Sequence, residues 1–221
     1  MSAERPRLLV ATFNPGKARE LVRLLSPAGF EVVGLSDLGV REPYEETGGT
    51  YEDNARGKAL HYAALARLTA LADDSGLEVD ALGGRPGPLS ARFGGAGLDD
   101  AARCRLLLDE LAGVPEERRT ARYVAVVALA RPGGAPDSRS AVTPPASATR
   151  LFRATCEGRI ASAMRGPRGF GYDPIFFYPP FSATFGEIAE EEKDRVSHRG
   201  LALAKVAAFL KSPEGKSFLT I

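Results

Sequence analysis

The chain has 221 residues, of which 44% are hydrophobic and 26% charged, and its formal net charge is +1. These proportions are typical of a globular protein in water, and near-neutrality excludes the broad basic field that nucleic acid or an anionic membrane would need. Two cysteines without a CxxC spacing exclude a disulfide-rich scaffold. The polar N-terminus, and apolar runs far shorter than the ~20 residues of a membrane span, predict a cytoplasmic enzyme or binding protein.

The first part of the chain predicts a strand, two helices and a second strand. The apolar run 8–11 is typical of a strand, and Asn14 followed by proline is a favourable start for a helix. Thr50 with an aspartate three residues later resembles a capping box, which predicts another helix. A buried strand is expected to end at Ala72, and the polar run 73–76 then predicts a turn.

The sequence of the second part of the chain predicts a helix, a hairpin and a last helix, together with two long loops. A loop rich in glycine and proline is expected at 83–97, and the shift to Pro, Ser, Ala and Gly at 131–148 predicts a flexible surface excursion. Strands alternating with helices, plus one hairpin, indicate an α/β fold in a single domain over 1–221. The other predicted elements are a helix that begins at Asp99 and Asp100, a hairpin of strands 123–130 and 151–156, a strand at 175–178, a last helix capped by Ser197, and a tail at 213–221.

A candidate phosphate site lies in the turn 12–17, between the first strand and the first helix. A helix N-terminus presents unpaired backbone N–H groups and a positive dipole end, and Lys17 adds a full charge. The turn is not a Walker loop, because Ala11 stands where that motif needs glycine and Ala18 stands where it needs Ser or Thr. Taken alone, these residues also fit a simple helix cap with a solvated lysine.

Two acidic segments are candidates for binding a cation. Glu46 lies in a glycine-containing loop, where a carboxylate can hold Mg²⁺, and Asn54 and Lys58 share one face of the helix that follows. Asp73 and Asp74 follow a predicted strand, where open α/β sheets bind ligands, so one of them could bind a metal or activate water. A solvated acidic loop and a capped turn are the alternatives for these two segments.

Two later segments are candidates for recognising a base. Phe170 lies between two glycines, which suits a platform on which a base stacks, and Asp173 could accept hydrogen bonds from a ring or a sugar. His198 and Arg199 follow Ser197 in the first turn of a helix, where positive charge opposes the dipole unless an anion is bound. An ordinary aromatic turn and an exposed histidine are the alternatives.

Together these segments resemble the family of inosine triphosphate pyrophosphatases, which cleave non-canonical purine nucleotides. The segments occur in the family's order and cover nearly the whole chain. One departure is Leu89, where the family often has tyrosine. The resemblance is carried by ATFNPGK (11–17), EETGGTYEDNARGKA (45–59), ADDSGLEVDALGGRPGPLSARF (72–93), GFGYDPIFF (169–177) and EEKDRVSHRG (191–200).

The resemblance implies roles for individual residues. Asp74 matches the family's catalytic aspartate, which is also a metal ligand, and Glu46 matches a metal-binding glutamate. The implied cation is Mg²⁺, with Mn²⁺ as an alternative. The residues that match substrate-binding positions are Thr12, Phe13, Asn14, Pro15, Gly16, Lys17 and Lys58 on the phosphate side, Ser75, and Phe170, Gly171, Tyr172, Asp173, Lys193, His198 and Arg199 around the nucleoside.

The resemblance also implies a fold, a reaction and partners. The implied fold is an elongated mixed α/β sheet between two lobes, assembled as a homodimer. The implied reaction is the hydrolysis of ITP, dITP and XTP to the monophosphate and pyrophosphate, so the partner is a small purine nucleotide and neither nucleic acid nor a membrane. The alternatives are a Maf-like pyrophosphatase of pyrimidine or modified nucleotides, and a non-catalytic nucleotide-binding protein, against which the carboxylates of Glu46 and Asp74 argue.

Overall fold

The structure is a computed structural model that describes residues 5–95, 97–133 and 149–219. Most of the predicted excursion at 131–148 therefore lies outside the described residues. The chain divides into two compact units, each built from separate stretches of sequence. The first unit comprises Met1–Asp74, Val126–Arg153 and Ala202–Ile221, and the second comprises Ser75–Ala125 and Ala154–Leu201.

A mixed β-sheet connects these stretches, with the hydrogen-bonded strand order β2-β1-β3-β5-β6-β7-β8, and β4 pairs with β3. β1 is parallel to β2 and β3, whereas the pairs β3/β4, β6/β7 and β7/β8 are antiparallel. The α/β fold and the pairing of the two hairpin strands are thus confirmed. The strands are β1 (Arg7–Val10), β2 (Glu31–Gly34), β3 (Ala70–Val79), β4 (Pro86–Gly87), β5 (Thr120–Ala130), β6 (Thr149–Ile160), β7 (Phe176–Tyr178) and β8 (Ala183–Thr184).

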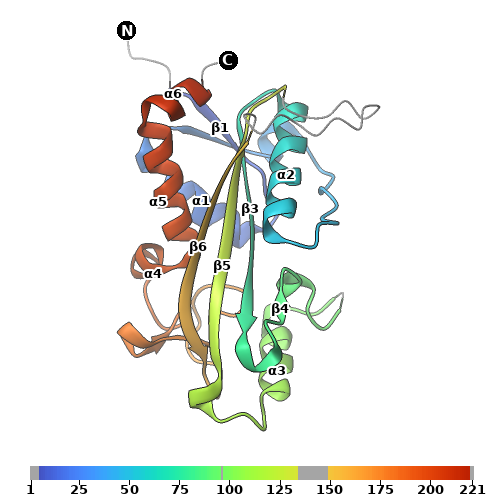
Figure 1. The fold of residues 1–221 in the computed structure, drawn as a ribbon, viewed down its shortest axis with the longest axis vertical. Coiled ribbons are helices and arrows are strands. Elements are labelled where there is room, and N and C mark those ends of the chain that lie inside the picture. Colours follow the sequence, from blue (N-terminus) through green and yellow to red (C-terminus); the bar gives the residue numbers. More distant parts are fainter. Residues whose placement is uncertain (1–4, 96, 134–148, 220–221) are drawn as a thin grey trace. The chain divides into compact units, whose positions relative to one another are not determined.

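The helices of the first unit cover both faces of its part of the sheet. The chain moves from β1 to β2 and then back across β1 to β3, and right-handed crossovers in opposite directions place their helices on opposite faces. Accordingly, α2 lies on one side of β3, and α1 and α5 lie on the other (Figure 1). None of the described helices is long and apolar enough to cross a bilayer. The helices of the whole chain are α1 (Pro15–Leu25), α2 (Tyr51–Ala66), α3 (Asp100–Glu110), α4 (Glu190–Val196), α5 (His198–Lys211) and α6 (Pro213–Leu219), with short 3-10 turns at Ser26–Ala28, Ser36–Leu38, Asp80–Leu82, Ser90–Arg92, Glu116–Arg118 and Pro179–Phe181.

The polar run 73–76 is not a turn, and this prediction was wrong. β3 continues through it to Val79, with Asp73 fully buried and Asp74 only 4% exposed. A strand tolerates adjacent buried carboxylates when each has a partner, and here Lys17 pairs with Asp73 while Asn54 donates a hydrogen bond to Asp74. Those partners lie far away in the sequence, so local turn propensity could not anticipate them.

The prediction of a tail at 213–221 was also wrong, because α6 follows α5. Pro213 occupies the first helical position, and the Ser212 Oγ accepts a hydrogen bond from the Gly215 N–H at 3.1 Å. Phe218 is 4% exposed and packs with Phe209 at a ring-centroid distance of 5.7 Å. A serine cap followed by proline is therefore a start signal that the sequence did carry.

Removing the cap of α2 is expected to destabilise the protein. The Thr50 Oγ1 accepts a hydrogen bond from the Asp53 N–H at 3.1 Å and donates to the Asp53 carboxylate at 2.8 Å, so Thr50 is confirmed as the helix cap, with its hydroxyl in place of the backbone N–H that a full capping box would use. We expect Thr50→Ala to lower the free energy of unfolding by about 1 kcal/mol. Thr50→Ser keeps the hydroxyl and serves as the control. Urea unfolding curves that coincide for the Ala and Ser variants would contradict this account.

Candidate functional site

The turn between β1 and α1 forms the N-terminus of a helix, which is capped by side chains of the turn. The Asn14 Oδ1 accepts a hydrogen bond from the Lys17 N–H at 3.0 Å, and the Thr12 Oγ1 accepts one from the Asn14 N–H at 3.2 Å. The first turn of α1 holds no acidic residue, and Phe13 is 45% exposed. The predicted helix start is thus confirmed, and a helix N-terminus free of negative charge is suited to an anion.

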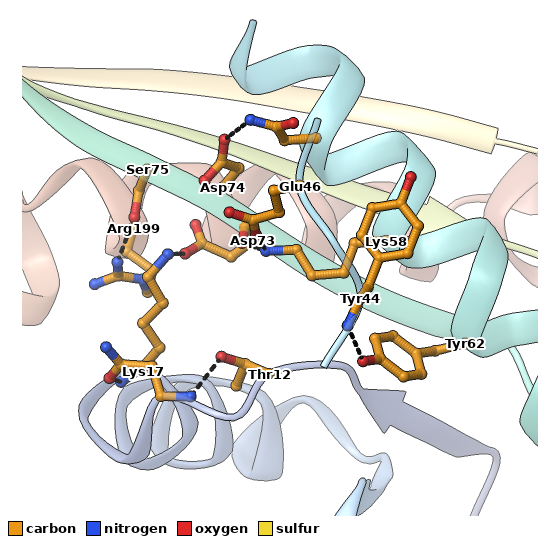
Figure 2. A network of polar contacts seen from close by, with 12 residues as sticks. Thr12, Lys17, Tyr44, Glu46, Lys58, Tyr62, Asp73, Asp74, Ser75 and Arg199 are labelled. Carbon is orange, nitrogen blue, oxygen red and sulfur yellow. Dashed lines mark hydrogen bonds and ion pairs between the residues drawn. The ribbon is translucent and has the colours of Figure 1, made fainter. Parts of the chain in front are cut away.

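Two lysines of the first unit are held by carboxylates. The Lys17 Nζ lies 2.8 Å from the Asp73 Oδ2. The Lys58 Nζ donates to the Glu46 Oε1 and, at 3.1 Å, to the Asp73 backbone carbonyl. Figure 2 shows Lys58 reaching from α2 to both acceptors. Residues that are widely separated in the sequence therefore meet beside β3, as the predicted phosphate and metal residues should.

Asp74 is a buried carboxylate with a raised pKa. Its Oδ2 accepts a hydrogen bond from the Asn54 Nδ2 at 3.0 Å. Burial is the main cause of the raised pKa and the charge of Glu46 adds to it, whereas Lys17, Lys58 and the Asn54 hydrogen bond act in the opposite direction. A carboxylate with a raised pKa is a stronger base than an ordinary aspartate, so Asp74 is suited to accepting a proton from water.

The same cluster has the chemistry of a hard-cation site. Among Lys17, Glu46, Lys58, Asp73 and Asp74, the carboxylates outnumber the ammonium groups, which leaves a net negative charge. Within the described ranges, no three His, Cys, Asp or Glu side chains converge as a metal centre. Mg²⁺ needs only one or two protein carboxylates when water and substrate phosphates supply its other ligands, so Glu46 and Asp74 fit this ion.

The second unit builds a different cluster around Asp173, which is 2% exposed. The Asp173 Oδ2 accepts hydrogen bonds from the Phe170 N–H at 2.9 Å and from the Lys193 Nζ at 2.6 Å, and the Tyr123 hydroxyl donates to Oδ1 at 3.3 Å. Gly169 has a φ of +77°, and a side chain there would overlap the Asp173 carboxylate. Asp173 thereby fixes the turn that carries Phe170.

Two cations lie over the ring of Phe170. The Lys193 Nζ is 4.9 Å and the Arg199 Cζ 5.6 Å from the ring centroid, within the range of a cation–π interaction. An Arg199 guanidinium nitrogen also donates to the Ser75 Oγ at 2.9 Å. The ring is partly exposed, so it combines an aromatic face with nearby hydrogen-bond donors. That combination is what recognition of a planar, oxygen-bearing base needs.

His198 and Arg199 begin α5 as predicted, and both side chains are buried. The Ser197 Oγ accepts a hydrogen bond from the Gly200 N–H at 3.1 Å, which confirms the predicted cap. His198 is 3% exposed, and its ring stacks on Tyr123 with centroids 4.5 Å apart and planes 9° apart. The alternative of an exposed histidine is therefore wrong.

The structure also shows contacts of two neighbouring residues in the nucleoside segment. The Gly171 N–H donates to the Asp100 Oδ2 at 2.7 Å, and the Tyr172 hydroxyl donates to the Ser90 carbonyl at 2.9 Å. Burial raises the pKa of Tyr172, and the side chain is only 4% exposed. These contacts orient the turn; a direct contact of either residue with substrate stays a prediction.

Three residues of these clusters received no role of their own from the sequence: Asn54 and Asp73 were named only as members of candidate segments, and Tyr123 was not singled out. Asn54 holds Asp74, Asp73 holds Lys17, and Tyr123 links Asp173 to His198. A signal existed for Asn54, because its spacing of four from Lys58 places both on one face of α2. Tyr123 lies within a buried apolar strand and carried no comparable signal.

Comparison with known proteins identifies the family of this chain. A sequence profile described as the Ham1 family matches residues 8–209. The chain belongs to the Ham1 family. A dITP/XTP pyrophosphatase from Symbiobacterium thermophilum is 50% identical over 199 residues, which cover 90% of this chain and 92% of that protein. A second dITP/XTP pyrophosphatase, from Desulforamulus reducens, is 45% identical over 206 residues, which cover 92% of this chain and 95% of that protein.

Solved structures extend the Ham1 likeness to three dimensions. The HAM1 protein of Coxiella burnetii superposes with a TM-score of 0.79 at 35% identity, covering 92% of this chain and 98% of that chain. The nucleoside-triphosphatase, or dITP/XTP pyrophosphatase, of Mycobacterium abscessus superposes with a TM-score of 0.68 at 44% identity, covering 90% of this chain and 98% of that chain. The Ham1 fold thus spans both units.

Proposed function

We propose that this chain hydrolyses non-canonical purine nucleoside triphosphates, among them ITP, dITP and XTP, to the monophosphate and pyrophosphate. The reaction removes these nucleotides from the nucleotide pool. The observation that carries the proposal is the buried carboxylate of Asp74, with its raised pKa, in a cluster with Glu46 and two lysines. The names of the similar proteins from Symbiobacterium thermophilum and Desulforamulus reducens support the same reaction.

The first unit binds the triphosphate in this proposal. The N-terminus of α1, in the turn 12–17, attracts the phosphate oxygens through the positive end of its dipole, and Lys17 and Lys58 neutralise their charge. Both ammonium groups are paired with carboxylates in the structure, so each exchanges a protein carboxylate for a phosphate when the nucleotide binds. The lysines are thereby held close to their working positions before the substrate arrives.

Hydrolysis occurs at the anhydride bond between the α- and β-phosphates. Asp74 accepts a proton from water as the water oxygen attacks the α-phosphorus; the anhydride bond breaks, and pyrophosphate leaves with the bond's electron pair. Glu46 and Asp74 would hold a divalent cation, Mg²⁺ or alternatively Mn²⁺, which neutralises negative charge on the triphosphate. Asn54 keeps the Asp74 carboxylate oriented during these steps.

The second unit recognises the base in this proposal. Phe170 stacks on the purine, and Lys193 and Arg199 donate hydrogen bonds to the 6-oxo group. Adenine carries an amino group at that position, which would set a hydrogen-bond donor against the donors of Lys193 and Arg199. A site built to donate to an oxygen rejects an analogue that lacks it strongly, because the donors lose a hydrogen bond that the 6-oxo group would accept.

A homodimer in the cytoplasm completes the proposal. Both features come from the resemblance to the pyrophosphatase family rather than from a contact in the described residues. Size-exclusion chromatography with light scattering measures the mass of the protein in solution and so tests the homodimer directly. A mass of one chain at micromolar concentration would reject the dimer and leave the proposed reaction untouched.

The proposed reaction is tested by measuring pyrophosphate release from ITP, XTP, dITP, GTP, ATP and dTTP, with Mg²⁺ and with EDTA. We expect metal-dependent release from the first three and little from the others, with the matching monophosphate as second product. Preferential cleavage of dTTP would favour a Maf-like specificity. Binding of ITP without turnover under all conditions would favour a non-catalytic nucleotide-binding protein.

A further inference from the structure

The segment 42–48, which carries Glu46, lies along α2. Positions 44, 46 and 48 are half-buried and positions 45 and 47 are exposed, an alternation that is typical of an extended segment with one side against the protein. The Glu46 carboxylate pairs with Lys58, and a Cβ at position 48 would lie 2.6 Å from the Asn54 Oδ1. The segment therefore contacts α2 closer and closer to the N-terminus of that helix.

The hydroxyl group of Tyr62 holds the start of this segment by two hydrogen bonds. Tyr62 is 1% exposed and lies on α2 four positions after Lys58, so both share one helix face. Its Oη accepts a hydrogen bond from the Tyr44 N–H at 2.7 Å, shown in Figure 2, and donates one to the Glu42 carbonyl at 3.0 Å. Burial raises the pKa of Tyr62, so the hydroxyl keeps the proton that it donates.

The side chain of Tyr44 packs on the same helix. Its ring centroid lies 5.4 Å from that of His61, and a Cβ at position 57 would overlap its hydroxyl group. Glycine is unfavourable inside a helix, and at position 57 its missing side chain makes room for the Tyr44 ring. The segment 42–48 is therefore attached to α2 through its backbone as well as through a side chain.

Tyr62 also contacts the candidate phosphate turn. The Phe13 ring lies edge-on to the Tyr62 ring, with centroids 6.4 Å apart and planes 66° apart. Tyr62 thus contacts both the turn 12–17 and the segment that carries the proposed metal ligand Glu46. Ordering a loop costs conformational entropy, so a carboxylate that is held in place in advance binds a cation more tightly than one on a mobile loop.

We propose that Tyr62 is a positioning residue for Glu46. Its hydroxyl fixes the backbone at residues 42 and 44, and the Glu46 carboxylate is thereby held where it binds the divalent cation. Tyr62 acts through Glu46 and takes no part in the chemical step. This inference rests on the proposed pyrophosphatase reaction and adds to it a residue that sets the affinity for the cation.

The main test is Tyr62→Phe, which removes the hydroxyl group and keeps the ring. We expect the half-saturating Mg²⁺ concentration for ITP hydrolysis to rise about tenfold, with kcat at saturating Mg²⁺ within about twofold of wild type. The dissociation constant of Mn²⁺, measured by EPR with the uncleavable analogue α,β-methylene-ITP, should rise by a similar factor. The matched control is Tyr178→Phe, the same exchange on β7 in the second unit, which should leave both values unchanged.

A double variant shows whether Tyr62 acts through Glu46. Glu46→Gln keeps the shape of the side chain and removes its charge, so it should raise the half-saturating Mg²⁺ concentration by itself. Adding Tyr62→Phe to Glu46→Gln should then change that concentration less than about twofold, because the ligand to be positioned is already lost. The same tenfold rise in both backgrounds would mean that Tyr62 acts elsewhere, and would overturn the proposal.

Hydrogen exchange measured by NMR tests the positioning without metal or substrate. The Tyr44 amide should exchange at least about tenfold faster in Tyr62→Phe, while amides in the middle of α2 keep their protection. Loss of protection throughout α2 would indicate general destabilisation and overturn the proposal. Wild-type Mg²⁺ and Mn²⁺ affinities in Tyr62→Phe would also overturn it, while the proposed pyrophosphatase function stands. Wild-type protein that releases no pyrophosphate from any nucleotide would overturn both.

Discussion

Replacing Asp74 by asparagine is expected to lower kcat for ITP about 1,000-fold, since general base catalysis contributes 10²–10⁴ in rate. Asparagine has the same shape and keeps an oxygen that can accept the hydrogen bond from Asn54, but it cannot take a proton from water. Burial already disfavours the charged form of Asp74, as its raised pKa shows, so the neutral side chain should not cost stability. Steady-state kinetics with ITP and a thermal melt measure the two effects.

The control for this variant is Asp80→Asn. Asp80 is exposed just beyond the end of β3 and bonds to Thr120 and Arg122, and its pKa is lowered chiefly by the Thr120 hydrogen bond. Its loss should leave kcat within about twofold of wild type, because it lies outside the proposed catalytic cluster. An Asp74→Asn variant that keeps more than about a tenth of the wild-type kcat would place the base elsewhere.

The parts of the fold that the sequence predicted correctly depend on neighbours along the chain. Asn14, Thr50 and Ser197 were identified as helix caps, and each accepts a hydrogen bond from an amide three residues ahead. Capping depends on a few consecutive residues, so its signal is contained in a short segment. The same holds for the apolar run that forms β5, which is buried almost along its whole length.

The parts that the sequence did not predict depend on contacts between distant segments. Asp73 and Asp74 were placed in a turn because the polar run 73–76 consists of residues that favour turns, and a buried strand holds two adjacent carboxylates only when something compensates them. The compensation comes from Lys17 on α1 and Asn54 on α2, and nothing in a window around residue 73 reports it. Tyr123 is a further case, since its hydroxyl matters only through Asp173, fifty positions away.

The two candidate clusters hold their cations in the same way. Lys17, Lys58 and Lys193 are each paired with a carboxylate, of Asp73, Glu46 and Asp173 respectively. Pairing allows ammonium groups to be buried without a net positive field, consistent with the formal charge of +1 for the chain. Selective attraction of nucleotides must then come from the geometry of the site rather than from long-range steering.

The Lys193–Asp173 pair allows the structural and functional roles of a lysine to be separated. Side-chain exposures of 5% and 2% make this a buried ion pair, with the Lys193 Nζ 2.6 Å from the Asp173 Oδ2. We expect Lys193→Met to lower the free energy of unfolding by about 3–5 kcal/mol, because it leaves the Asp173 carboxylate buried without its cation. Guanidinium unfolding curves measure the loss.

The double variant Lys193→Met with Asp173→Asn should recover part of that stability, with a coupling energy of about 1–3 kcal/mol, because no uncompensated charge remains. Its KM for ITP should nevertheless stay at least about tenfold above wild type, since the proposed donor to the 6-oxo group is still missing. Additive losses of stability in the double variant would show that the two residues are not coupled. A wild-type KM alongside recovered stability would confine Lys193 to a structural role and leave Arg199 as the donor that distinguishes oxo from amino purines.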